Sequence, residues 1–187
     1  MENIRSAFEQ GFSSVLHALS RITSGDVQFR ILHFRAHVMD KGTFPGLPVL
    51  DSKEDGVLLT TQITGDIVGR NYLFLSGYEL EKLSAGDRGV TREAFIKELH
   101  NVLSSSVLST FCNKFGIRAV NGPPAFVRSF NAKPEDMIVQ DFTTAADEIY
   151  VAVTSFFLKA NPWFAPLFVW VIDKESLHIF SEKRMAG

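Results

Sequence analysis

The chain carries the same succession of expected elements twice, and this repetition constrains its fold more than any other feature. In the first half, a helical apolar repeat over residues 3–22 precedes a strand pattern at 27–38, a hairpin and a short helix. The second half opens with a helix expected over 91–115 and follows the same order. The two endings, residues 73–80 and 170–177, align so that a serine or an aspartate, both good N-caps, opens each short helix.

Each half contains an expected antiparallel hairpin. In the first half, apolar runs at 57–63 and 67–75 flank a Gly-Asp turn, and in the second half the runs lie at 148–159 and 164–172. A Ser-x-x-Glu capping box at Ser76 opens the first short helix. The remaining expected segments are a loop over 41–54, short strands at 117–120 and 125–130, and a closing helix over 173–180.

Two halves of this kind predict an α+β fold. A pseudo-twofold arrangement would pack two long helices on one continuous, mainly antiparallel β-sheet. The chain has 187 residues, which is long enough for one such domain with a substantial core. We therefore predict a single domain over 1–187, made of related halves at about 1–86 and 87–187.

Composition and charge exclude several classes of partner. Hydrophobic residues make up 45% and charged residues 21%, as in an ordinary globular protein. The net charge of −2 and the lack of a Lys/Arg run argue against nucleic-acid binding. The N-terminus has no signal-peptide pattern, and no apolar run reaches the roughly 18 residues that cross a bilayer. We expect a cytoplasmic protein without membrane insertion.

The second long helix carries a carboxylate and a carboxamide side by side. Helical periodicity places Ala94, Glu98, Asn101 and Ser105 on one outward stripe, opposite the apolar side of the helix. Pro124 follows Asn101 after 22 intervening residues. The first long helix can be aligned with the second in two registers, and neither places an asparagine three residues after a glutamate. At most one such site is therefore expected.

The pattern Glu-x2-Asn-x22-Pro resembles the signature of the CheC/CheX/FliY family, phosphatases that dephosphorylate the response regulator CheY. The family has Asp or Ser four residues before the glutamate, where this chain has Ala94. The resemblance implies the CheC-type fold, with Asn101 orienting the attacking water, Glu98 engaging a lysine of the receiver domain, and Pro124 shaping the loop beside the helix. It also implies that Mg²⁺ is supplied by the receiver-domain substrate, and that this chain binds no cofactor of its own.

Two functions follow as hypotheses from the resemblance. The first is a phosphatase that hydrolyses the aspartyl phosphate of a phosphorylated CheY-like receiver domain, in chemotaxis or another two-component pathway. The alternative is a catalytically inactive binding or scaffold module, as the relative FliM suggests. Ala94 and the degenerate first helix favour the module, whereas the intact spacing of Glu98, Asn101 and Pro124 favours the enzyme. Formation of a homodimer and association with a CheD-like partner stay open.

Other conspicuous residues are expected to be structural. Cys112 has no adjacent base and is assigned to packing. His33 and His37 lie too far apart on a strand to share a metal ion. His100 points to a different side of the helix from the motif. An apolar hairpin tip at 161–164 is either part of the packing or a contact surface.

Overall fold

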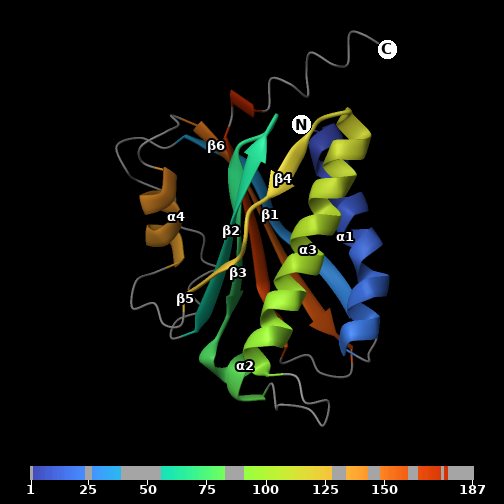
Figure 1. The fold of residues 1–187 in the computed structure, drawn as a ribbon, viewed down its shortest axis with the longest axis vertical. Coiled ribbons are helices and arrows are strands. Elements are labelled where there is room, and N and C mark those ends of the chain that lie inside the picture. Colours follow the sequence, from blue (N-terminus) through green and yellow to red (C-terminus); the bar gives the residue numbers. More distant parts are fainter. Residues whose placement is uncertain are drawn as a thin grey trace.

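The computed structural model describes residues 2–23, 27–38, 56–82, 91–127, 134–142, 148–159, 164–173 and 175–176. Figure 1 shows helices on both faces of a twisted sheet, with the two longest helices side by side on one of them. In chain order the elements are α1 (Glu2–Thr23), β1 (Val27–Val38), β2 (Val57–Gly65), β3 (Gly69–Leu75), α2 (Gly77–Lys82), α3 (Arg92–Phe115), β4 (Ala119–Asn121), β5 (Ala125–Val127), α4 (Pro134–Phe142), β6 (Glu148–Leu158) and β7 (Leu167–Asp173).

The strands form a seven-stranded sheet in the order β1-β6-β7-β3-β2-β4, with β5 also paired to β2. All pairs are antiparallel. The order is symmetric about the central β3–β7 pair. The first half contributes the β2–β3 hairpin and the edge strand β1, and the second half contributes the β6–β7 hairpin and the edge strands β4 and β5. Extending the alignment of residues 73–80 with 170–177 by one residue toward the N-terminus matches Tyr72 with Val169. These two residues face each other across the β3–β7 pair. The predicted α+β fold with a mainly antiparallel sheet is confirmed.

Matching hydrogen bonds join the end of each half to the hairpin of the other. Glu79 Oε1 accepts a hydrogen bond from the Ala165 backbone N–H at 2.7 Å. Ser176 Oγ accepts one from the Val68 backbone N–H at 2.8 Å. The alignment of the halves equates Glu79 with Ser176 and Val68 with Ala165, so the two bonds occupy equivalent places. We call this pair the cross-half hydrogen bonds. The boundary between the two halves, at about residue 86, remains a prediction.

Helices α1 and α3 cover one face of the sheet and enclose the larger core. Its centre is aromatic: the Phe8 ring meets Phe111 edge-on at 4.8 Å, and Phe111 stacks on Trp170 at 6.0 Å between centroids. Gly11 of α1 faces α3 so closely that a Cβ at this position would lie 2.9 Å from the Val107 Cα. Glycine therefore sets how near the two helices come.

Helix α4 packs on the opposite face of the sheet and was not expected from the sequence. Its Ile138 is fully buried against a second apolar cluster. Asp141 accepts a hydrogen bond from Tyr72 Oη at 2.8 Å and pairs with Arg70 at 3.2 Å. Burial, together with the Asp141 carboxylate, raises the pKa of Tyr72. The signal in the sequence was Pro134, which suits the first turn of a helix and is followed by two acidic residues.

Most expected elements are confirmed, with differences at their ends. The strand expected at 117–120 begins only at Ala119, because the Ile117 N–H bonds back to the Cys112 carbonyl and closes α3. At the C-terminal end, β7 extends through Asp173, and the described part of the following helix is 175–176. The loop expected over 41–54, most of the tip at 161–164 and the end of the strand expected at 125–130 lie outside the described residues.

Candidate functional site

Helix α3 presents the predicted polar stripe to solvent. Its start is fixed by Thr91, whose hydroxyl accepts from the Ala94 N–H at 3.2 Å, and its end by Gly116 in a left-handed conformation with φ 59°. Between these caps Glu98, Asn101 and Ser105 are exposed. The apolar side is turned to the core through eight buried residues: Ile96, Leu99, His100, Leu103, Ser104, Val107, Leu108 and Phe111.

Glu98 and Asn101 point outward with their polar atoms available. Both side chains are exposed, one turn apart on the same side of α3. No hydrogen bond or ion pair joins either of them to another residue in the described ranges. A carboxylate with open acceptor sites and a carboxamide with both donors and acceptors are thus held on a rigid rod.

Pro124 lies in a break between two short edge strands. β4 and β5 both pair with β2, and the Gly122-Pro123-Pro124 segment connects them. The Gly122 N–H donates to the Gln62 carbonyl at 2.8 Å, which keeps the segment against β2. Pro124 is half-buried and has no N–H for a ladder hydrogen bond. Its role in shaping this loop remains a prediction.

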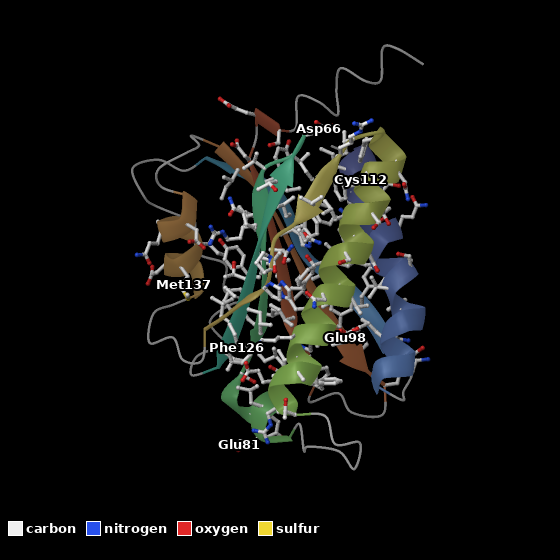
Figure 2. All side chains as sticks on the ribbon, viewed as in Figure 1. Asp66, Glu81, Glu98, Cys112, Phe126 and Met137 are labelled. Atoms are coloured by element: carbon white, nitrogen blue, oxygen red, sulfur yellow. The ribbon has the colours of Figure 1, made fainter. Side chains whose placement is uncertain are left out.

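Lys97 links α3 to the same edge of the sheet. Its Nζ bonds to Glu93 Oε1 at 2.9 Å and lies 5.9 Å from the centroid of the Phe126 ring on β5. Figure 2 places Glu98 on α3 and Phe126 on the neighbouring β5 segment. The Glu93–Lys97 spacing is typical of a helical ion pair, but no sequence pattern indicated the contact with Phe126. Lys97 and Glu93 therefore form a neutral ion pair beside the motif, through which α3 contacts β5.

Ala94 occupies the position where the family pattern has Asp or Ser. Its methyl group is exposed, and its backbone N–H is used by the Thr91 cap. Nothing in the cap depends on the methyl group. The position could therefore carry a polar side chain without displacing a buried neighbour.

The buried side of α3 contains two polar residues that bond to the sheet. His100 Nε2 lies 2.8 Å from Thr61 Oγ1 on β2, and Ser104 Oγ accepts from Asn71 Nδ2 on β3 at 2.6 Å. The His100 ring meets Phe168 edge-on at 5.9 Å. Burial lowers the pKa of His100 to about 4, so the imidazole is neutral near pH 7. As expected, His100 lies away from the exposed stripe.

The remaining sequence candidates do not join the motif. Cys112 is half-buried against the larger core, with its Sγ 3.8 Å from the Ala119 carbonyl. His33 and His37 lie on β1, and the structure does not describe their side chains. In the part of the chain that the structure describes, no group of three or more His, Cys, Asp or Glu side chains is placed to hold a metal ion. None of the described helices combines the length and apolarity needed to span a membrane.

No protein-family model matches the sequence, and no curated protein matches it either. Solved structures do resemble it. FliY of Thermotoga maritima has a TM-score of 0.64 at 18% identity, over 97% of this chain and 96% of that chain. The FliM middle domain of Vibrio alginolyticus has a TM-score of 0.60 at 10% identity, over 97% and 98%.

A third solved structure is the CheX-CheY-BeF3-Mg²⁺ complex of Borrelia burgdorferi, with a TM-score of 0.53 at 14% identity, over 90% of this chain and 96% of that chain. Identities this low are evidence about fold alone. Together with the other CheX and CheC-like structures that match, they confirm the fold expected from the motif.

Proposed function

Because the chain has the fold of CheC, CheX and FliY, we propose that it hydrolyses the aspartyl phosphate of a phosphorylated CheY-like receiver domain. One observation carries the proposal. Glu98 and Asn101, at the spacing of the family signature, are both exposed on α3, and neither bonds to another described residue. Such a pair can engage an incoming protein without first breaking bonds of its own.

Asn101 would orient the attacking water. Phosphoryl transfer depends mainly on positioning and electrostatics, and the receiver brings its own Mg²⁺ as part of the substrate. A carboxamide can accept one hydrogen bond from the water and donate another, which fixes the orientation as well as the place of the nucleophile. Asn101 lies on a capped helix of 24 residues, so its backbone needs little reorganisation when the receiver binds.

Glu98 would pair with a lysine of the receiver. Its carboxylate lies one turn before Asn101, so docking through Glu98 would bring the phosphoryl group toward the carboxamide. In this arrangement Glu98 contributes mainly to affinity and alignment, and Asn101 mainly to the chemical step. Pro124 would keep the β4–β5 segment clear of the incoming receiver.

A second candidate function has support of its own. The FliM middle domain resembles this chain over nearly its whole length, with a TM-score of 0.60. Ala94 also removes one polar group of the family signature. Both observations favour a binding module that keeps the fold and lacks the activity.

The test is phosphate release from phosphorylated receiver domains, with Mg²⁺, in the presence of wild type or Asn101→Ala. We expect wild type to accelerate release and Asn101→Ala to lower kcat by about 100- to 1,000-fold, the usual cost of losing one positioned donor. Ser105→Ala, on the same exposed stripe one turn further on, is the matched control and should keep the wild-type rate. A receiver that binds without faster release would favour the binding module.

The proposal also implies where the reaction takes place and which substrate it uses. It places the protein in the cytoplasm, with a receiver from chemotaxis or another two-component pathway as the substrate. Association with a CheD-like protein and formation of a homodimer are separate questions, which size-exclusion chromatography with and without the receiver would address.

A further inference from the structure

The structure assigns a positioning role to the hydrogen bonds that hold the buried side of α3 on the sheet. We define the polar anchor as His100 and Ser104 of α3 with Thr61 of β2 and Asn71 of β3. We infer that it sets the rotation and height of α3 and thereby the direction in which Asn101 points. This inference rests on the proposed function, since Asn101 is the residue it positions.

The geometry of the polar anchor is that of a two-point attachment. His100 and Ser104 are one helical turn apart, and their partners Thr61 and Asn71 face each other on neighbouring strands. The two bonds, of 2.8 Å and 2.6 Å, therefore fix α3 at two places along its axis. One such bond would allow the helix to tilt about its attachment point, whereas two bonds one turn apart resist this tilt, and each resists rotation because it lies off the helix axis.

The apolar neighbours of α3 limit its distance from α1 but supply a less directional constraint on its rotation. Side chains such as Leu99 and Leu103 are buried by an effect that depends on area and not on angle, so they restrain the rotation of the helix less sharply than a hydrogen bond does. A hydrogen bond weakens steeply when its angle changes. His100 directly precedes Asn101, so the constrained turn is the one that carries the proposed catalytic carboxamide.

Stability alone gives no reason for polar residues at these four places. All four residues are at most 2% exposed. In the described part of the chain, His100 Nδ1 and Asn71 Oδ1 have no hydrogen-bond partner. Incompletely satisfied buried polar groups are unfavourable, and apolar residues of similar volume are often neutral or stabilising in their place. A directional contact under the motif is what these residues provide and apolar residues do not.

The experiment uses the double variant Thr61→Val/His100→Leu, which replaces one bond of the polar anchor by apolar groups of similar volume. We expect its thermal midpoint to equal or exceed that of the wild type. We expect kcat for receiver dephosphorylation to fall about 10- to 100-fold, the scale of a displacement of about 1 Å, with a smaller change in KM. Thr61→Ser, which keeps the hydroxyl, should retain the wild-type kcat.

Two comparisons separate positioning from a general structural role. In an Asn101→Ala background, the double variant should lower kcat no further, because the polar anchor acts through Asn101. Tyr72→Phe, which removes a partly buried hydrogen bond on the opposite face of the sheet, should leave kcat unchanged. A folded double variant with the wild-type kcat would overturn the inference, and so would additive losses in the Asn101→Ala background.

A crystal structure of the double variant supplies a readout that does not depend on activity. We expect α3 to be rotated or shifted relative to β2 and β3, with the Asn101 side chain displaced. An unmoved α3 would overturn the inference whatever the kinetics show. If wild type dephosphorylates no receiver, the proposed function fails, and the position of α3 in the variant still decides whether the polar anchor positions the helix.

Discussion

At the scale of residues, α3 separates two kinds of polar side chain. Glu98 and Asn101 are exposed and bond to no described neighbour, so their chemistry is directed outward. His100 and Ser104 are buried and bonded to the sheet, so their chemistry is directed inward. The same turn of helix thus carries both the groups proposed to meet the receiver and a group that fixes where they stand.

Ala94 gives a prediction that tests the departure from the family pattern. Ala94→Asp adds a carboxylate one turn before Glu98 at an exposed position, so the fold should tolerate it. One additional hydrogen bond to the receiver would lower KM by about 2- to 10-fold. The measurement is phosphate release as a function of receiver concentration.

Ser105→Asp is the control for this substitution, because it adds the same charge to the same stripe on the other side of Asn101. It should leave KM near the wild-type value. An equal change in KM for both variants would mean that the net charge of the helix, and not the position of residue 94, is what the receiver senses.

His100 predicts a pH dependence of stability. Its pKa is lowered from 6.5 to about 4 in the folded protein, and burial is the cause. Between these values the unfolded chain binds a proton that the folded chain does not, so stability falls as the pH falls. The loss amounts to about 3 kcal/mol between pH 6.5 and 4.

The measurement is urea unfolding of wild type and His100→Leu across this pH range. Other titrating groups contribute to both proteins, so the difference in slope isolates His100. The variant should lose less stability toward pH 4 than the wild type does. Parallel slopes would show that the imidazole is protonated in the folded state or is reached by solvent.

The exposed pair could be predicted from the sequence, and the polar anchor could not. A period of 3.6 residues is enough to place Glu98 and Asn101 opposite the apolar side of one helix. The partners of His100 and Ser104 come from β2 and β3, which precede α3 in the chain. Their place under α3 depends on sheet order and register, and no local pattern encodes either one.

At the scale of elements, the spacing of α1 and α3 depends on Gly11. Gly11→Ala would improve helix propensity by about 0.5–1 kcal/mol, since glycine is unfavourable inside a helix. The added Cβ would nevertheless lie 2.9 Å from the Val107 Cα and force the helices apart. We expect a net loss of about 1–3 kcal/mol in the free energy of unfolding.

Urea unfolding measures this loss, and Gln10→Ala serves as its control. Gln10 is the exposed neighbour of Gly11, so its truncation should change stability by less than the effect expected at Gly11. If Gly11→Ala were more stable than the wild type, the two helices would have room to separate without losing their packing.

Helix α4 shows where local sequence patterns are insufficient. It has only nine residues; Ile138, Met137 and Val139 pack on the second apolar cluster, and Asp141 contacts Tyr72 and Arg70. A helix this short is unstable in isolation and forms because the sheet covers its apolar side. Pro134 and the acidic residues after it suited a helix start, but the tertiary contacts that stabilise it were not visible in the sequence.

At the scale of the whole molecule, the symmetric sheet has two unlike edges. On one side β1 runs as a continuous strand from Val27 to Val38. On the other side the equivalent edge is divided into β4 and β5 by the Gly122-Pro123-Pro124 segment. The divided edge lies beside α3, whose exposed stripe carries the motif, whereas α1 has no such pair. The sequence repeat predicted the symmetry, and the prolines mark the half in which it is broken.

The cross-half hydrogen bonds should contribute unequally to the stability of the whole. Glu79 accepts from the Ala165 N–H and also from the backbone and hydroxyl of Ser76, at 2.7, 2.7 and 2.8 Å. Glu79→Gln keeps the shape but turns one acceptor oxygen into a donor facing these groups. We expect a loss of about 1–3 kcal/mol in the free energy of unfolding. Ser176→Ala removes the neutral bond from the Val68 N–H at 2.8 Å and a long one to the Val68 carbonyl at 3.5 Å, and should cost about 0.5–1.5 kcal/mol.

Urea unfolding of both single variants and of the double variant tests this order. The two bonds share no partner and join different hairpins, so their losses should add. Phosphate release by the folded variants should match the wild type, since neither bond touches α3. Equal losses for the two single variants would mean that the glutamate acts as one ordinary hydrogen-bond acceptor. Strongly non-additive losses would mean that the two halves separate as a unit once either bond is removed.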